Sequence, residues 1–528
     1  MSGINENPMY ENKPRYAGIL LHITSLPGPY GIGDLGSEAY QFADSLSDAK
    51  VGLWQVLPLG PVGFGSSPYA ARSSFAGNEL FISPDILLKN GLLDEAETSR
   101  LKSIISKKKQ TDKVNRVDFH LVEMHKMPLL KKAARRFMEK LKNDPDIDSA
   151  GFNTFCHNEA YWLDDYAVFQ VLCDEYYDAR WHSKWNKSIS KRRLITLRKI
   201  HKEKENEILE WKVLQYFFEC QWQKLKSYVN SKGIKIIGDI PIFAATDSAD
   251  TWTHLNLFKT DRSGKFTFVS GVPPDYFSST GQLWGNPVYN WKKMKLRGYS
   301  WWVERIRRML THVDLFRIDH FRGFDEYWSV PSDHTTAEHG TWEKGPGADL
   351  FHTLEKKLGK LPVLAEDLGF LTEGVKKLRD DLGFPGMKVC QFGFEDMKNG
   401  KLDARHLFLP HNYSYNWAAY TGTHDNNTTA GWYSKLNKED QNTVTSYLNC
   451  KTNDPKDITW AMIRAVISSQ AQYAIFPLQD LLGLGEEARF NLPSTCKVEN
   501  WSWRLRELPS LEIIKEFASL VELYSRGD

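Results

Sequence analysis

The sequence contains no cysteine pair at the CxxC spacing of a redox or zinc site, and no other cysteine spacing typical of a metal site. Its six cysteines are scattered along the chain: Cys156, Cys173, Cys220, Cys390, Cys450 and Cys496. This scatter argues against a disulfide framework. We therefore expect free, mostly buried thiols in a reducing cytoplasm.

Charge of one sign is not in excess either. Lys and Arg number 68 against 66 Asp and Glu, and a net charge of +2 gives no reason to expect a nucleic-acid partner. The basic run 184–204 has few interleaved aromatics, so we interpret it as a solvated helix. No apolar run approaches membrane-spanning length, and the polar first residues lack the apolar core of a signal peptide. We expect a cytoplasmic protein without a membrane partner.

Aromatic residues, in contrast, are abundant. The chain has 18 Trp, 22 Tyr and 28 Phe among 528 residues, more than a core alone calls for. Surplus Trp and Tyr suit flat stacking surfaces, and sugars are the ligands whose C–H faces use such surfaces most. The length allows two to four average domains, or one large α/β barrel with insertions.

Eight short apolar runs, separated by segments with helical patterns, read as buried strands. They cover residues 18–24, 53–58, 234–243, 314–324, 363–369, 388–392, 420–427 and 473–478. Strands that are apolar rather than alternating, in β–α–β order, indicate a parallel sheet. Eight of them predict an α/β fold, a (β/α)8 TIM barrel. The alternative, an open doubly wound sheet, would require a GxGxxG after the first strand, and the sequence has none there.

The chain between the second and third predicted strands is charged and helical in pattern. We therefore expect three parts: residues 1–82 as the first part of the barrel, 83–231 as a helical insertion subdomain, and 232–528 as the remainder of the barrel with long active-site loops. One such loop is the stretch 271–287, rich in Pro, Gly and aromatics, which we expect to be irregular and functional.

The fourth predicted strand contains two charged residues in an apolar setting. Arg317 and Asp319 are two residues apart, so in a strand their side chains point the same way. A guanidinium beside a buried carboxyl group holds it ionised, as a covalent nucleophile requires. Taken alone, the pair is better explained as a structural ion pair.

Acids also end three other predicted strands, and in a barrel all four converge on one mouth. They are Asp239, Asp319, Glu366 and Asp425, with Arg317 and His424 among them. Crowded carboxyl groups cannot all ionise, so the one beside the Arg stays charged while another keeps its proton. A retaining glycosidase needs this division between nucleophile and general acid. A metal site is the weaker alternative, because an Arg lies in the cluster and no HxH or HExxH is present.

Four short segments carry a resemblance. FRIDHFRGF, LAEDLG, GTHDNNT and GDIPIF are similar to blocks of the α-amylase superfamily, and more specifically to the amylomaltase or disproportionating-enzyme family, the 4-α-glucanotransferases of glycoside hydrolase family 77. Further matching motifs are HITSLPGPYGIGDLG, WQVLPLGP, SSPY, GVPPDYFS, TGQLWGNPVYNW, GTWEKGPG and QDLLGLGEEARFN. Together they cover nearly the whole chain, from about residue 16 to 503.

The resemblance implies an enzyme that transfers a segment of an α-1,4-glucan to the 4-hydroxyl of an acceptor glucan or glucose. It implies a retaining double displacement without a cofactor, with Asp319 as nucleophile, Glu366 as general acid/base and Asp425 as the third acid. The substrate-binding residues that it implies are Tyr69, Asp239, Asp275, Trp284, Asn286, Arg317 and His424. The expected partners are α-1,4-glucans, maltooligosaccharides and glucose, and the expected assembly is a monomer or homodimer.

The chain departs from the pattern in one loop, where many relatives carry Glu at the position of Ser279. Two alternatives stay open from the sequence. An α-glucan hydrolase would use the same motifs with water as acceptor. A catalytically silent glucan-binding protein would be free to lose Asp319, Glu366 and Asp425, and their presence counts against it.

Overall fold

The computed structural model describes residues 13–109, 115–143, 148–274, 278–369 and 371–527. Its central sheet has eight parallel strands in the order β10-β11-β12-β1-β2-β3-β6-β9. These strands are β1 (Tyr16–Leu20), β2 (Leu53–Gln55), β3 (Lys235–Pro241), β6 (Leu315–Asp319), β9 (Val363–Ala365), β10 (Gly386–Val389), β11 (Trp417–Tyr420) and β12 (Tyr473–Pro477). All eight overlap the predicted runs.

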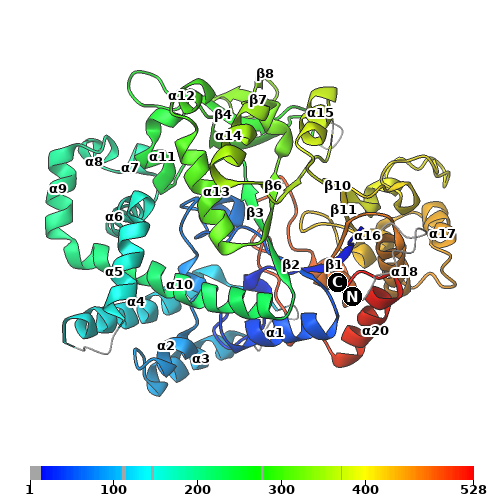
Figure 1. Ribbon diagram of the computed structural model, residues 1–528, viewed down its shortest axis with the longest axis horizontal. Helices are drawn as coiled ribbons and strands as arrows, with labels where there is room; N and C mark the ends of the chain where they lie inside the picture. Colours follow the sequence, from blue (N-terminus) through cyan, green and yellow to red (C-terminus); the bar gives the residue numbers. More distant parts are fainter. Residues whose placement is uncertain (1–12, 110–114, 144–147, 275–277, 370, 528) are drawn as a thin grey trace, which may run out of the picture.

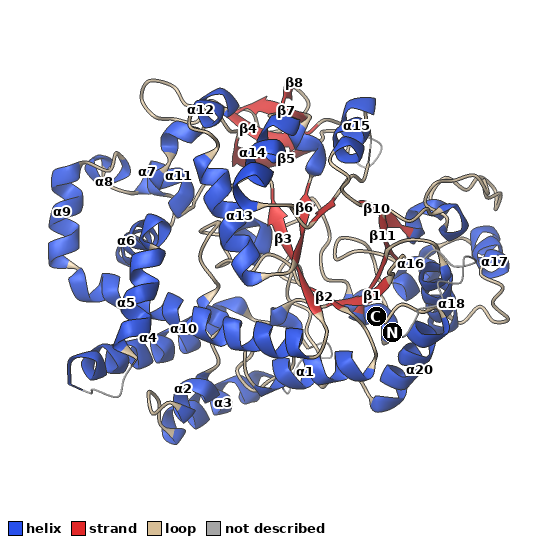
Figure 2. Cartoon of the chain, in the orientation of Figure 1, coloured by secondary structure: helices blue, strands red, loops and turns tan. Residues whose placement is uncertain are grey.

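The strands form a nearly closed barrel. The first strand, β1, pairs along its whole length with the last, β12, so the order in space follows the order in sequence around the ring. Between β9 and β10 the junction includes one hydrogen bond, from the Ala365 N–H to the Pro385 carbonyl at 2.8 Å. The prediction of a (β/α)8 barrel is confirmed. Figure 2 shows the strands at the centre with helices around them.

Helices cover the outside of the barrel because each presents an apolar stripe to it. In α13, for example, Trp301, Trp302, Val303 and Ile306 are buried. The helices outside the segment between β2 and β3 are α1 (Ser37–Asp48), α11 (Ala249–Thr253), α12 (Trp291–Leu296), α13 (Ser300–His312), α14 (Ala348–Leu358), α15 (Glu373–Asp381), α16 (Thr429–Lys435), α17 (Lys438–Tyr447), α18 (Pro455–Ser468), α19 (Leu478–Leu481) and α20 (Leu511–Leu523). Within the described ranges, no helix is both long and apolar enough to cross a membrane.

The segment between β2 and β3 carries the helices that the sequence predicted there, drawn in light blue to green in Figure 1. They are α2 (Pro84–Lys89), α3 (Glu95–Lys109), α4 (Phe119–Asn143), α5 (Ser149–Asn158), α6 (Ala160–Tyr176), α7 (Trp181–Lys184), α8 (Lys187–Ser190), α9 (Leu194–Glu203) and α10 (Glu205–Ser231). The longest, α10, packs against both α4 and α6. These helices form one wall of the cleft described below.

The expectation of an irregular stretch over 271–287 was wrong at both ends. There, β4 (Phe268–Val272) and β5 (Gln282–Pro287) form an antiparallel pair, extended by β7 (Glu326–Pro331) and β8 (Thr341–Lys344) into a second sheet of order β5-β4-β7-β8. Gly271 permits the pairing, because a Cβ there would lie 2.5 Å from the Gln282 carbonyl oxygen. Pro287 is tolerated because β5 is an edge strand. Figure 1 shows this sheet at the top of the view.

Two strands also end earlier than predicted. β6 stops at Asp319 because His320 adopts a left-handed backbone, with φ +52°. β11 stops at Tyr420, before a turn in which the Asn426 side-chain oxygen accepts hydrogen bonds from the Thr423 N–H and hydroxyl. As a result, the predicted site residues that follow β11 lie on a loop.

Candidate active site

A cleft of about 2640 Å³ opens at the carboxyl ends of the barrel strands. Seven of the ten residues predicted for the site line it: Tyr69, Trp284, Asn286, Arg317, Asp319, Glu366 and Asp425. Asp239 and His424 are buried directly behind them, in contact with Arg317 and Asp425 respectively. The tenth, Asp275, lies outside the described residues. The structure thus brings nine of the ten together.

Arg317 connects two of the acids. Its Nη2 lies 2.9 Å from Asp319 Oδ1, and its Nη1 lies 2.8 and 3.0 Å from the two carboxylate oxygens of Asp239. Asp239 is fully buried, and burial raises its pKa to about 6, so that it is still ionised at neutral pH. The side chain of Asp319, by contrast, is 30% exposed and faces the cleft. The guanidinium therefore fixes Asp319 from behind and leaves its other oxygen accessible.

Glu366 follows β9 and lies across from Asp319. Its Oε1 accepts a hydrogen bond from the Leu368 N–H at 2.7 Å, and its Oε2 accepts one from the His320 N–H at 2.8 Å. Burial raises the pKa of Glu366 to about 7, and the negative charge of Asp319 adds to this effect while Arg317 opposes it. Near neutral pH a substantial fraction of Glu366 is therefore protonated, as a general acid must be.

Asp425 is held by the adjacent His424 and by Arg489 and Asn491, which lie in the segment after β12. The Asn491 side-chain amide donates to Oδ1 at 2.6 Å, His424 Nε2 lies 3.2 Å from Oδ2, and the Arg489 guanidinium donates to the main-chain carbonyl at 2.6 Å. Burial raises the pKa of Asp425, but His424 and the Asn491 amide outweigh it and leave this pKa well below its usual range. Asp425 is thus kept ionised.

Sequence reasoning gave no role to Asn491 or Arg489. Both lie in the motif QDLLGLGEEARFN, which was recognised only as a mark of the resemblance. Their contacts with Asp425 depend on a chain reversal after β12 that no local pattern predicts. The available signal was their place in the segment that follows the last predicted strand.

Aromatic rings pack beside these acids. The Tyr69 hydroxyl donates to Asp239 at 2.8 Å, and its ring stacks on His424 with centroids 5.3 Å apart. Trp501, which was not predicted for the site, packs on both rings: its ring centroid lies 5.7 Å from that of Tyr69 and 6.0 Å from that of His424. Across the cleft, Trp284 is 38% exposed, as a stacking surface for a ligand would be.

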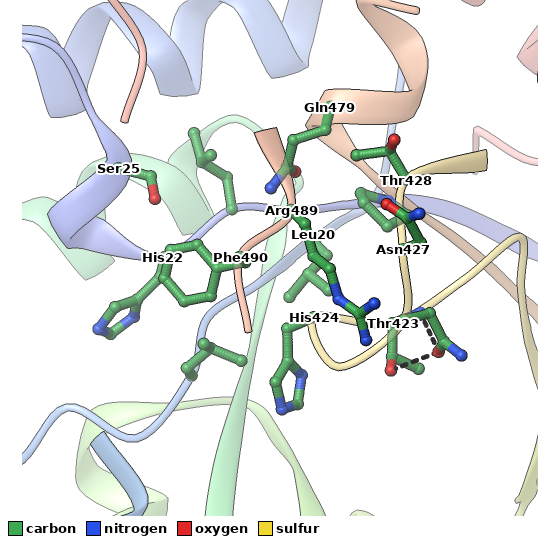
Figure 3. Close-up of a pocket in the computed structure, with 14 residues that line it drawn as sticks. Leu20, His22, Ser25, Thr423, His424, Asn427, Thr428, Gln479, Arg489 and Phe490 are labelled. Carbon is green, nitrogen blue, oxygen red and sulfur yellow. Dashed lines mark hydrogen bonds between the residues drawn. The ribbon is translucent and has the colours of Figure 1, made fainter. Parts of the chain in front are cut away.

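A second, much smaller cavity lies behind His424 (Figure 3). Its volume of about 20 Å³ suits one water molecule. Among the described residues, His22 Nδ1 and Asn427 Oδ1 are buried there without a hydrogen-bond partner. Burial lowers the pKa of His22 to about 3, with a further contribution from His424, so His22 is neutral. A sugar does not fit this cavity, and the cleft is the candidate substrate site.

The arrangement in the cleft supports acid-assisted nucleophilic displacement. It places an exposed carboxylate fixed by a guanidinium beside a carboxyl group that holds a proton near neutral pH. Over the described ranges, no group of three or more His, Cys, Asp or Glu residues is arranged to hold a metal ion.

Comparisons with known proteins agree with this chemistry. A sequence model of a protein family described as 4-alpha-glucanotransferase matches residues 21–510. Several relatives carry the same name, and two of them illustrate the likeness. The one from Synechocystis sp. is 43% identical over 97% of this chain and 98% of its own length, and the one from Thermus thermophilus is 42% identical over 93% and 95%. Among solved structures, the amylomaltase from Streptococcus agalactiae in complex with acarbose is 37% identical, with a TM-score of 0.89 over 97% of this chain and 100% of that one.

Proposed function

The chain belongs to the 4-alpha-glucanotransferase family, and on that premise we propose that its cleft cuts an α-1,4-glucan and joins the donor segment to the 4-hydroxyl of another glucan or of glucose. The activity as such follows from the family. The observation that carries the assignment to this site is the pairing of Asp319, held by Arg317, with Glu366, whose pKa burial raises to about 7.

The reaction has two displacement steps. In the first, an oxygen of Asp319 attacks the anomeric carbon of the donor, while Glu366 gives its proton to the glycosidic oxygen that leaves. A glycosyl ester on Asp319 and a shortened glucan result. In the second, Glu366 takes the proton from the acceptor's 4-hydroxyl as that oxygen attacks the same carbon and displaces Asp319. Two inversions give net retention.

The surrounding residues bind the sugar next to the bond that breaks. Asp425, held from behind by His424, binds its hydroxyl groups, Tyr69 stacks on its face, and Arg317 with Asp239 fixes the nucleophile. Trp284 and Asn286 belong to the wall of the cleft, and a substrate contact of Asp275 stays a prediction from the resemblance. A cleft of about 2640 Å³ accommodates several glucosyl units, which supports maltooligosaccharides and longer glucans as substrates.

Pure maltotriose tests the reaction. Transfer yields glucose together with longer oligosaccharides, and the total number of reducing ends stays constant. A rise in reducing ends that matches the loss of maltotriose would instead identify a hydrolase. Binding without any change in product sizes would identify a silent glucan-binding protein.

The organisation and location of the protein complete the proposal. Residues 83–231 act as a helical subdomain, because side chains of α4, α6 and α10 line the far part of the cleft. The protein acts in the cytoplasm, where its six free cysteines would stay reduced, and cell fractionation tests this location. It works as a monomer or homodimer, which sedimentation distinguishes.

A further inference from the structure

The residue after the nucleophile has an unusual backbone. His320 has φ +52° and ψ +49°, in the left-handed region that is uncommon for residues other than Gly, although His, Asn and Asp adopt it more often than the rest. Such conformations persist where the surroundings impose them, and they gather at functional sites. At His320 the conformation ends β6 directly beside the reacting groups.

Two neighbours hold the His320 ring in place. The ring packs edge-to-face on Trp284, with centroids 4.7 Å apart and planes at 88°. On another side it lies against Gly323, where an added Cβ would be 3.2 Å from the imidazole Cδ2. Burial lowers the pKa of His320 to about 4, so the ring is neutral at physiological pH and acts by packing.

The left-handed backbone turns the His320 N–H toward Glu366. This N–H donates to Glu366 Oε2 at 2.8 Å. The main chains of the same two segments are joined on either side, through Phe321 N–H to the Glu366 carbonyl and Glu366 N–H to the Ile318 carbonyl, each at 3.0 Å. The carboxyl group of Glu366 is therefore oriented by a peptide group whose own direction depends on the conformation of His320.

We propose that His320 is a positioning residue for Glu366: its left-handed backbone, which the packing of its ring against Trp284 and Gly323 supports, keeps its N–H on the carboxyl group. This hydrogen bond fixes the direction of the proton that Glu366 gives to the leaving oxygen. It also favours the charged form of Glu366 and so limits how far burial raises the pKa. The inference rests on the proposed function, because it concerns the acid named there.

Other charged groups also face Glu366. Arg317 and Asp319 on β6 act on its titration most directly, one favouring the charged form and the other opposing it. Asp239 on β3 is tied to the same guanidinium, and Asp425 after β11 and Glu395 after β10 line the same cleft. Substitution of His320 leaves all of these in place, so a change in the titration of Glu366 reports on the hydrogen bond.

Two substitutions separate the backbone of His320 from its ring. His320→Val disfavours the left-handed backbone, because β-branched residues rarely adopt it, whereas His320→Asn removes the ring but tolerates that backbone. We expect His320→Val to lower kcat/KM for maltotriose by about 10- to 100-fold, and to move the basic limb of its pH profile up by about one pH unit. His320→Asn should leave the limb near its wild-type position.

A donor with a good leaving group, such as an α-maltosyl fluoride, gives a second readout. Departure of fluoride needs little protonation, so the loss in His320→Val should shrink with this donor. A purely structural role would give the same loss with both donors. If His320→Val does not fold, His320→Ala should show the same changes in smaller measure.

Lys50→Val is the matched control. Lys50 has φ +56° at the turn before β2, at the opposite end of the barrel. Val disfavours the left-handed backbone at this position to a similar extent, so the variant should have a lower midpoint of thermal unfolding. The pH profile of its kcat/KM should not move.

The proposal would be overturned by an unmoved basic limb in His320→Val, by an equal shift in His320→Asn, or by an equal loss with the fluoride donor. Failure of the proposed function would look different. The wild-type enzyme would then release reducing ends from maltotriose, while the pH profiles would still decide the role of His320.

Discussion

Removal of the Arg317 guanidinium should lower the stability of the folded protein, because it leaves a buried carboxylate of the site without its counter-charge. Arg317→Met keeps much of the side-chain volume, but it leaves the fully buried Asp239 with the Tyr69 hydroxyl as its remaining side-chain hydrogen-bond partner among the described residues. Breaking a buried ion pair from one side typically costs about 3–5 kcal/mol. The lost contact with Asp319 adds less to this free-energy cost, because the Asp319 side chain is 30% exposed and water can replace the guanidinium there.

The expected change in thermal midpoint follows from chain length. Unfolding entropy of about 2.1 cal/mol/K per residue gives roughly 1.1 kcal/mol/K for 528 residues, so the midpoint should fall by about 3–5 °C at neutral pH. Differential scanning calorimetry measures it.

The pH dependence of this loss has a definite sign. The folded-state pKa of Asp239 is raised to about 6, so ionising it in the folded protein costs nothing below the unfolded pKa of about 4, costs progressively more between pH 4 and 6, and then stays constant. Without Arg317, which lowers this pKa, the cost continues to grow above pH 6. The difference from wild type should therefore be small in acid and largest at neutral pH and above.

The double variant Arg317→Met, Asp239→Asn is the control. It removes both charges, so most of the lost stability should return while activity does not, because Asp319 still lacks its guanidinium. An unchanged midpoint in Arg317→Met at neutral pH, or a double variant as unstable as the single one, would refute the reasoning.

Three further predictions concern the reaction. Asp319→Asn and Glu366→Gln should each lower turnover by several orders of magnitude with the fold retained, and mass spectrometry of Glu366→Gln with an activated donor should find the glycosyl ester on Asp319; a sugar on any other residue would contradict the assignment. The wild-type kcat/KM should fall as pH rises through about 7, because the protonated form of Glu366 is lost there; a profile flat to pH 9 would exclude Glu366 as the acid. Asn491→Ala should lower kcat/KM by about 10- to 100-fold through loss of its hydrogen bond to Asp425, and an unaffected variant would show that His424 suffices.

Much of the fold and part of the site were accessible from the sequence. Apolar runs located all eight barrel strands, because parallel strands buried on both faces carry a continuous apolar signal. The Arg317–Asp319 contact followed from their spacing alone and is present at 2.9 Å. The second sheet was not predicted, because the Pro and Gly residues of its edge strand are also typical of a loop.

The remaining contacts depend on segments that meet only in three dimensions. The contact of Arg317 with Asp239 joins neighbouring strands that are 78 residues apart in sequence, and that of Asn491 with Asp425 joins loops 66 residues apart. The ring of His320 likewise packs on Trp284, which comes from another strand. Local patterns carry no information on such pairings, so residue types could be predicted but not their partners.

The pairing of β1 with β12 has a consequence for synthesis of the chain. One edge of β1 finds its partner only when residues beyond Tyr473 have left the ribosome, so a nascent chain carries an open strand edge through most of translation. Asn491 and Trp501 come later still, so the groups around Asp425 and Tyr69 assemble last. A chain truncated after β11 should therefore be inactive and prone to aggregate, and the enzyme cannot act on glucan before Trp501 has left the ribosome.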